Sequence, residues 1–172
     1  RTRKIKLNKT DLILCAKFRK GHFEGVLDVM DRFTKLISPK KIFMGEKDYQ
    51  QYYLVKKFLK DKYNVKIVKC KTIRSLGMVA LSSRNFLLNK KNLFVAGKIV
   101  KELLKFKRKI SKSDKINQYL MLIKKDLTKK YRIKVDYLEL RNLKNLKKSN
   151  TISNSKIFVA YYLNKVRLID NL

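Results

Sequence analysis

The sequence has few of the residues on which metal sites and disulfide frameworks depend. It contains one histidine, His22, and two cysteines, Cys15 and Cys70, and tryptophan does not occur at all. The two cysteines lie far apart, and neither has neighbours at the spacing of metal ligands. This excludes a zinc site. We expect both cysteines to be reduced and buried as small apolar side chains.

Long hydrophobic runs are absent as well. No stretch of about 18 or more apolar residues occurs, and residues 1–4 are followed by no apolar block of the kind found in signal peptides. We therefore expect a cytoplasmic protein with no membrane partner. With 172 residues, of which 45% are apolar, the chain can form one large domain or two small ones.

Negative charge is scarce: 13 acidic residues stand against 45 basic ones, for a net charge of +32. Clustered basic residues are typical of nucleic-acid binding, but here they occur in every segment instead of forming a tail or stripe. Alanine and proline are also rare, as in an AT-rich coding bias. Our hypothesis is that the charge reflects genome composition, with no specific nucleic-acid partner. Sequence-selective, salt-sensitive binding to DNA or RNA would contradict it.

Apolar spacing in the first part of the chain alternates between helix and strand periods. The segment 12–16 has no clean period and fits a short strand or a buried segment. Such alternation is typical of parallel strands covered by helices. The expected elements are, in order, a helix over 26–37 that ends before Pro39, a strand over 42–44, a helix over about 48–61 and a strand over 65–68.

From residue 73 the pattern changes. Residues 74–85 form a poorly periodic connection, which we interpret as a hinge between two units. A tail of strands, with Asn164-Lys165 as a hairpin turn, predicts an antiparallel sheet packed under helices. The expected elements are helices over about 90–107 and 113–131, the second with Ser113 as N-cap, and strands over 135–140, 157–163 and 166–169. We interpret Asp136 and Glu139 as strand-edge residues and Asp170 as structural.

Two short segments carry groups suited to phosphates. In residues 45–51, an apolar strand stops at a glycine and a polar cluster opens a helix, whose N-terminus offers free N–H groups and a positive dipole end. Residues 81–85 add two hydroxyls and a guanidinium. Taken singly, either segment is more typical of a turn or a serine-rich loop.

Four sequence blocks that occur in a fixed order favour the phosphate-binding interpretation over an ordinary turn or loop. With them, the chain resembles the pantoate:β-alanine ligase family, the pantothenate synthetases of the nucleotidyltransferase superfamily. The resemblance implies an α/β fold: residues 1–72 as the rear half of a Rossmann-like parallel sheet that binds ATP and pantoate, and residues 73–172 as a small α+β lid domain. The blocks are residues 19–26, 43–51, 80–85 and 166–171.

In that family, ATP and pantoate form a pantoyl adenylate with release of pyrophosphate, and the amine of β-alanine then displaces AMP to give pantothenate. The resemblance implies that Lys47 and Arg84 are catalytic and contact the phosphates, and that Gln51 binds pantoate. Arg19 and His22 lie in a loop that the family places beside the active site. The implied ATP contacts are Gly45, Glu46, Lys47, Asp48 (at the ribose), Ile73 (at the adenine), Leu81, Ser82, Ser83 and Arg84.

The chain also departs from the family. Lys20 stands where proline is usual, and Gly77-Met78 stands where an acidic residue and glycine are usual. The family's N-terminal segment, with its paired histidines, first pantoate glutamine and Mg²⁺-associated acidic residues, has no counterpart in this sequence. That amounts to roughly 100 residues. We therefore expect a C-terminal part that is inactive alone, holds no Mg²⁺ ligands, and forms a homodimer when completed.

Other functions remain open on the sequence alone. A basic nucleic-acid-binding module would not need the ordered blocks around Lys47 and Arg84, which favours the ligase. A non-functional remnant would keep them for a time. The sequence does not choose between a cut chain, a split subunit and a decayed gene.

Overall fold

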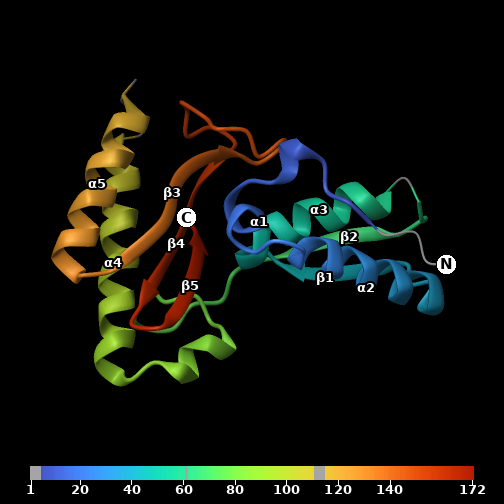
Figure 1. The fold of residues 1–172 in the computed structure, drawn as a ribbon, viewed down its shortest axis with the longest axis horizontal. Helices are drawn as coiled ribbons and strands as arrows, with labels where there is room; N and C mark the ends of the chain where they lie inside the picture. The colour runs from blue at the N-terminus through green and yellow to red at the C-terminus, as the bar shows by residue number, and fades with distance from the viewer. Residues whose placement is uncertain (1–4, 61, 111–114) are drawn as a thin grey trace. The chain divides into compact units, whose positions relative to one another are not determined.

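The computed structural model describes residues 5–60, 62–110 and 115–172. The chain divides into two compact units, Arg1–Lys71 and Thr72–Leu172, here called unit 1 and unit 2. Both are visible in Figure 1, and each is described by itself.

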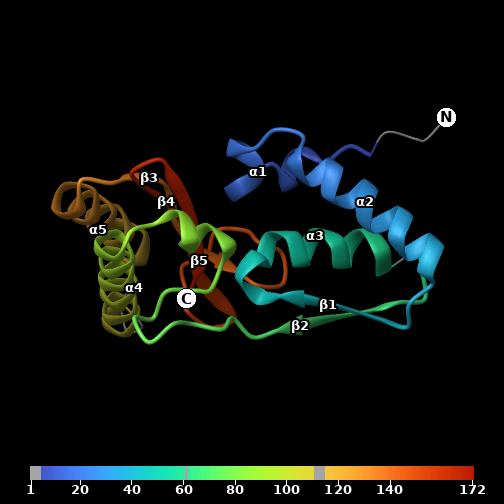
Figure 2. The same cartoon turned by 90° about the horizontal axis from the view of Figure 1, so that it is seen from below.

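Unit 1 is an α/β layer built on a two-stranded parallel sheet. Strand β1 pairs with β2 from Lys41↔Lys66 to Gly45↔Cys70. Helix α3 lies against both strands and α2 packs on α3, so both helices lie on the same side of the sheet (Figure 2). The elements are η1 (Lys9–Asp11), α1 (Leu14–Phe18), α2 (His22–Ile37), β1 (Lys41–Gly45), the short 3-10 helix η2 (Glu46–Asp48), α3 (Tyr49–Lys60) and β2 (Lys66–Cys70). The expected alternation of helices and parallel strands is confirmed.

Helix α2 shows why the periodic segment folds as predicted. It begins after Gly21, whose φ of 77° lies in the left-handed region that glycine adopts without a Cβ penalty. Its apolar stripe buries Phe23 and Leu27. The helix ends at Ser38, also left-handed, whose N–H donates to the carbonyl oxygen of Thr34, and Pro39 follows.

Two expectations for unit 1 need correction. The segment 12–16 is no strand, because Leu14 begins helix α1. Leu14, Cys15 and Ala16 are buried as expected, but Leu12 is 45% exposed. Cys70 is exposed, because it is the last residue of β2, where the strand leaves the sheet. Both cysteines are free thiols.

Unit 2 is a three-stranded antiparallel sheet, in the order β3-β4-β5, packed against α4 and α5 (Figure 1). The predicted hairpin between β4 and β5 is confirmed, and Asn164 takes a left-handed φ of 53° there. The predicted N-cap Ser113 lies outside the described residues. The elements are η3 (Ser83–Leu87), α4 (Lys90–Ile110), α5 (Ile116–Tyr131), β3 (Lys134–Asn142), β4 (Ser155–Leu163) and β5 (Val166–Asn171).

The core of unit 2 lies between the helices and the sheet. Strand β3 is an edge strand, as expected for Asp136 and Glu139, but Asp136 is not solvated. Its carboxylate is buried and accepts a hydrogen bond from Nε of Arg167 at 2.8 Å. The fully buried core side chains include Ile99, Leu103, Leu127, Leu140 and Ile157. Among the described helices, none combines the length and hydrophobicity that a membrane span requires.

The packing of α5 on the sheet generates a matched pair of predictions. Leu127→Ala empties a fully buried position, so we expect it to lower the free energy of unfolding of unit 2 by about 2–5 kcal/mol. Leu122→Ala, on the same helix at a side chain that is 56% exposed, should change it by no more than about 0.5 kcal/mol. Urea unfolding followed by circular dichroism measures both, and equal losses would contradict this account of the core.

Candidate functional site

The first candidate segment lies where strand β1 runs into helix α3. Gly45 ends the strand in an ordinary extended conformation, with φ −66° and ψ 131°. A Cβ built on Gly45 would meet no atom within 4 Å, so the described residues leave open space beside the backbone. A missing side chain at such a place lets a ligand approach the main chain closely.

Glu46, the next residue, is buried and its carboxylate is engaged. Nζ of Lys69, on strand β2, donates to Oε1 of Glu46 at 2.8 Å and lies 5.6 Å from the centre of the Tyr49 ring. Burial raises the pKa of Tyr49 to about 12, and the neighbouring Tyr52 and Glu46 add to the effect, so the phenol stays neutral at physiological pH. The Glu46 side chain therefore fastens the turn to β2.

Lys47, Asp48 and Gln51 are the accessible polar groups of this segment. Lys47 and Gln51 are half-buried, and Asp48 is exposed. Because η2 runs directly into α3, Lys47 and Gln51 follow one another by about one helical turn. Unit 1 thus presents a cation, a carboxylate and an amide around the N-terminus of α3.

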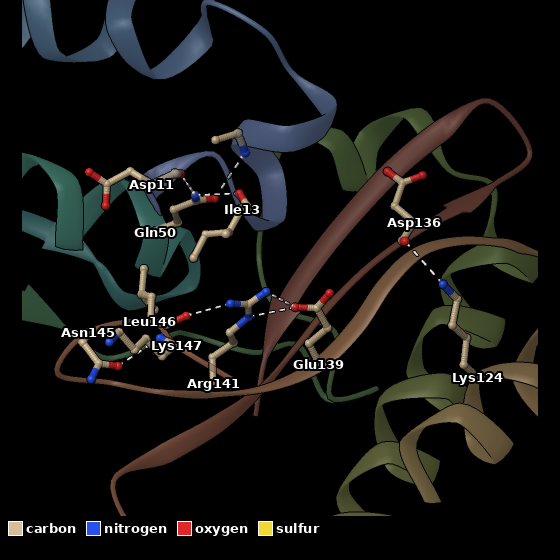
Figure 3. A network of polar contacts seen from close by, with 11 residues as sticks. Asp11, Ile13, Gln50, Lys124, Asp136, Glu139, Arg141, Asn145, Leu146 and Lys147 are labelled. Carbon is tan, nitrogen blue, oxygen red and sulfur yellow. Dashed lines mark hydrogen bonds and ion pairs between the residues drawn. The ribbon is translucent and has the colours of Figure 1, made fainter. Parts of the chain in front are cut away.

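The structure also assigns a role to Gln50, which the sequence analysis did not single out. Gln50 is buried, and its Nε2 donates to the carbonyl oxygens of Asp11 (3.3 Å) and Ile13 (2.7 Å), as Figure 3 shows. Its Oε1 accepts from the N–H of Ala16 at 3.4 Å. Nζ of Lys57 donates to the Asp11 carboxylate at 2.9 Å, which raises the pKa of Lys57. Helix α3 therefore holds segment 11–16, and nothing in a single sequence distinguishes Gln50 from Gln51.

Arg19 and His22 lie where that segment passes into helix α2. Arg19 caps the C-terminus of α1, with its N–H donating to the carbonyl oxygen of Cys15 at 2.9 Å. His22 is the first residue of α2, and its ring lies 5.0 Å from the ring of Phe23, centre to centre. Arg19 therefore begins the short connection between α1 and α2, and His22 is the first residue after it.

The second candidate segment lies in unit 2 and begins with a tight reversal of the chain. The N–H of Leu81 donates to the carbonyl oxygen of Ile73 at 2.9 Å, and Arg74 and Ala80 form an antiparallel bridge. This brings together two apolar side chains that are largely exposed, Ile73 at 67% and Leu81 at 53%. The segment 74–80 is hydrogen-bonded within unit 2, so the hinge predicted over 74–85 is wrong for these residues.

Ser82, Ser83 and Arg84 follow at the start of η3. The hydroxyl of Ser82 caps η3 by accepting from the N–H of Arg84 at 3.2 Å, while Ser83 is exposed. Nη1 of Arg84 donates to the carbonyl oxygen of Arg167, on β5, at 2.7 Å. The loop that was predicted to bind phosphates is therefore a shaped turn, with one hydroxyl already used by its own backbone.

Metal ligands do not gather among the residues that the structure describes. Within 5–60, 62–110 and 115–172, no three His, Cys, Asp or Glu side chains lie together in a way that could hold an ion.

Comparison with known proteins identifies relatives along nearly the whole chain. A family model described as pantoate-beta-alanine ligase matches residues 2–172. The pantothenate synthetase of Clostridium botulinum (strain ATCC 19397 / Type A) is 36% identical over 163 residues, which is 92% of this chain and 57% of that protein. That of Campylobacter hominis is 37% identical over 164 residues, covering 93% of this chain and 59% of the relative. The chain therefore spans between one half and two thirds of these relatives' length.

Solved structures show the same fold. Pantothenate synthetase from Thermus thermophilus superposes with a TM-score of 0.89 at 27% identity, covering 99% of this chain and 63% of that one. Pantoate-beta-alanine ligase from Francisella tularensis, solved with β,γ-ATP and β-alanine, gives a TM-score of 0.74 at 32% identity over 98% of this chain and 56% of that one. The resemblance predicted from four sequence blocks is confirmed.

The neighbouring residues Gln50 and Gln51 give a prediction about which of the two side chains stabilises unit 1. Gln50→Leu removes the three hydrogen bonds that the buried amide makes to segment 11–16, although the backbone groups of Asp11, Ile13 and Ala16 keep their bonds to one another. We therefore expect a loss of about 2 kcal/mol in the free energy of unfolding of unit 1. Gln51→Leu should change it by no more than about 0.5 kcal/mol, because Gln51 is half-buried on the helix surface. Denaturant titration checks this, and a larger loss for Gln51→Leu would contradict the assignment.

Proposed function

Because the chain belongs to the pantoate-beta-alanine ligase family, we propose that it carries the nucleotide-contacting part of an enzyme that joins pantoate to β-alanine. The reaction consumes ATP, passes through a pantoyl adenylate and releases pyrophosphate and AMP. Since the chain covers 57% of its Clostridium botulinum relative, the activity of the whole protein is part of this proposal.

The observation that carries the proposal is the turn from β1 into α3. There an open glycine, the start of a helical segment and the half-buried Lys47 occur together. Backbone N–H groups at such a turn bind anions, and a lysine adds a full positive charge. The Francisella tularensis relative was solved with β,γ-ATP, which supports a nucleotide as the anion.

In unit 1, we assign Lys47 to the phosphates, Asp48 to the ribose hydroxyls and Gln51 to pantoate. Glu46 contributes through its main chain, because its carboxylate is paired with Lys69. Attack of the pantoate carboxylate on the α-phosphorus breaks the bond to the β-phosphate, and the leaving pyrophosphate gains negative charge. A cation already in place stabilises that charge more than it stabilises the bound substrate, so it lowers the barrier.

In unit 2, the exposed pair Ile73 and Leu81 suits the flat apolar face of adenine. Ser82, Ser83 and Arg84 serve the phosphates. A guanidinium has five N–H donors, so Arg84 can keep its bond to the carbonyl oxygen of Arg167 and still donate to phosphate oxygens. Unit 2 acts as a lid over the nucleotide, as in other enzymes that close over reactive intermediates.

The remaining assignments follow from the family alone. Arg19 and His22 belong to the loop beside the active site, and the proton donor is a histidine of the N-terminal part. Mg²⁺ would add positive charge at the phosphates, but the residues described here gather no ligand set for it, so we route no step through the metal. A cytoplasmic location and a homodimer of the completed protein are also part of the proposal.

The first test is complementation. We expect residues 1–172 alone to release no AMP that depends on both pantoate and β-alanine, because the paired histidines and the first pantoate glutamine are not among them. Adding the N-terminal part of the Clostridium botulinum relative that this chain does not span, as a separate or fused polypeptide, should restore that release. Coupled measurement of AMP checks both.

The outcomes separate the alternatives. Robust activity of residues 1–172 alone would contradict the inferred division of the site. Activity only on mixing supports a split enzyme. A folded but silent mixture and a silent fusion would contradict the ligase proposal and favour a remnant.

The second test concerns Lys47. In the complemented protein, Lys47→Ala should lower the rate of pantoyl adenylate formation on the order of 10²-fold or more, because it removes a positioned charge-stabilising group. Lys60→Ala, at the exposed last residue of α3, the helix that follows Lys47, is the matched control and should leave the rate unchanged. Pantoate-dependent release of pyrophosphate in the absence of β-alanine reports this step, and a normal rate for Lys47→Ala would sink the assignment.

A further inference from the structure

Arg74 and Asp170 form a buried clasp for which the proposed function gives no role. Nη1 of Arg74 lies 2.7 Å from Oδ2 of Asp170 and Nη2 lies 2.9 Å from Oδ1, so the guanidinium grips both carboxylate oxygens. The Asp170 side chain is 4% exposed and that of Arg74 19%. The paired residues are 96 positions apart, one on strand β5 and the other in the chain reversal before the serine loop. Such bidentate pairs fix geometry as well as charge.

The same guanidinium also closes the chain reversal from within. Nη1 of Arg74 donates to the carbonyl oxygen of Met78 at 3.0 Å. The N–H of Ser75 donates to the carbonyl oxygen of Val79 at 2.9 Å. Arg74 therefore holds the two arms of segment 73–81 together and fastens them to β5.

A glycine contact supports the tip of this reversal from the other side. Gly97 is buried on helix α4, and a Cβ built on it would lie 2.4 Å from the carbonyl oxygen of Gly77. Real Cβ atoms do not come so close to backbone atoms, so the tip rests on α4 only because residue 97 has no side chain.

The loop that follows is fastened to the same strand. Arg84 donates to the carbonyl oxygen of Arg167 at 2.7 Å, and the side chain of Arg167 is in turn held by the buried Asp136. Nδ2 of Asn85 donates to the carbonyl oxygen of Ala80 at 3.1 Å. Strand β5 thus holds the chain on both sides of Ser82 and Ser83, and η3 lies against that strand.

We propose that Arg74 and Asp170 are positioning residues that hold loop 81–84 in a preformed shape for a polyphosphate. The inference rests on the proposed function of that loop. In this proposal neither residue contacts the substrate. Arg74 acts by holding the two arms of the chain reversal together, and Asp170 acts by holding the guanidinium of Arg74 in place. A loop already held in its binding shape spends less binding free energy on ordering, and a small displacement of charged groups costs much of their effect.

Hydrogen exchange on residues 1–172 tests the holding of the loop without requiring activity. Asp170→Asn keeps the shape of the side chain but removes the charge. We expect the amides of Leu81 and Asn85, which are hydrogen-bonded within this segment, to exchange at least about tenfold faster, because their bonds depend on the clasp. The amides of Leu103 and Ile157, in the core of unit 2, should keep their rates. Glu102→Gln, which breaks the Lys130 ion pair between α4 and α5, is the control and should leave the loop amides unchanged.

Kinetics of the complemented protein test the positioning. Asp170→Asn and Arg74→Lys should raise the KM for ATP by between about 10- and 100-fold, since a misplaced loop binds the triphosphate poorly. The KM for β-alanine should stay within about twofold. Asp170→Glu, which restores the charge, should recover part of the loss.

Gly97→Ala disturbs the same reversal through α4 without touching the ion pair. This variant should also speed hydrogen exchange at the amides of Leu81 and Asn85 and not in the core, even though alanine favours a helix more than glycine does. If Asp170→Asn does not fold, Gly97→Ala and Arg74→Lys carry the test.

The outcomes are distinguishable. A uniform rise in exchange across unit 2, with an unchanged KM for ATP, would overturn the positioning role and leave Arg74 and Asp170 as general stabilisers. Unchanged exchange at Leu81 and Asn85 would overturn it as well. If the complemented wild-type protein is inactive, the proposed function fails, and the exchange rates still decide whether the clasp holds the loop.

Discussion

Pairing of scarce carboxylates with abundant cations is the interaction on which both units depend. Asp170 meets Arg74 and Asp136 meets Arg167 in unit 2, while Glu46 meets Lys69 and Asp11 meets Lys57 in unit 1. Each pair joins segments that are distant in sequence. Partly buried pairs of this kind add little net stability, but losing one partner leaves a costly buried charge, so they select one arrangement of the chain. With 13 acidic residues among 172, the protein uses several of them where turns and loops must be held.

These pairs also explain how the two candidate segments are built. In each, a carboxylate with its own partner fixes the backbone beside the side chains that we propose as ligand contacts. Glu46 anchors the turn that presents Lys47, and Asp170 anchors the reversal that leads to Ser83 and Arg84. Positive charge near these segments therefore comes with a rigid support, whereas the lysines along the outer faces of α4 and α5 are mostly exposed. The net charge alone does not distinguish the cations at the two candidate segments from the exposed lysines of α4 and α5.

Much of the fold could be predicted because it depends on local patterns. The apolar stripe of α2 and the Asn164 turn are readable from a few residues each, and both are confirmed. The failures depend on distant partners. Residues 14–16 are helical, and segment 11–16 is held by Gln50, which lies 34 to 39 positions away in the chain. The chain reversal where we expected a hinge is fastened to Asp170. A single sequence records neither partner. Cys70 is exposed because the two-stranded sheet ends there, and the strand pattern of the preceding residues does not reveal where the pairing stops.

The central proposal is that Lys47 and loop 81–84 each contact the same nucleoside triphosphate in the complemented protein, and isotope-edited NMR tests it most directly. The measurement uses residues 1–172 labelled with ¹⁵N, complemented with the unlabelled N-terminal part of a relative, and titrated with ATP at two salt concentrations. The account predicts saturable shifts of the amides of Gly45–Asp48 and Leu81–Arg84 with one common dissociation constant. Shifts spread over the lysines of α4 and α5 that disappear at high salt, with residues 45–48 and 81–84 unchanged, would contradict it.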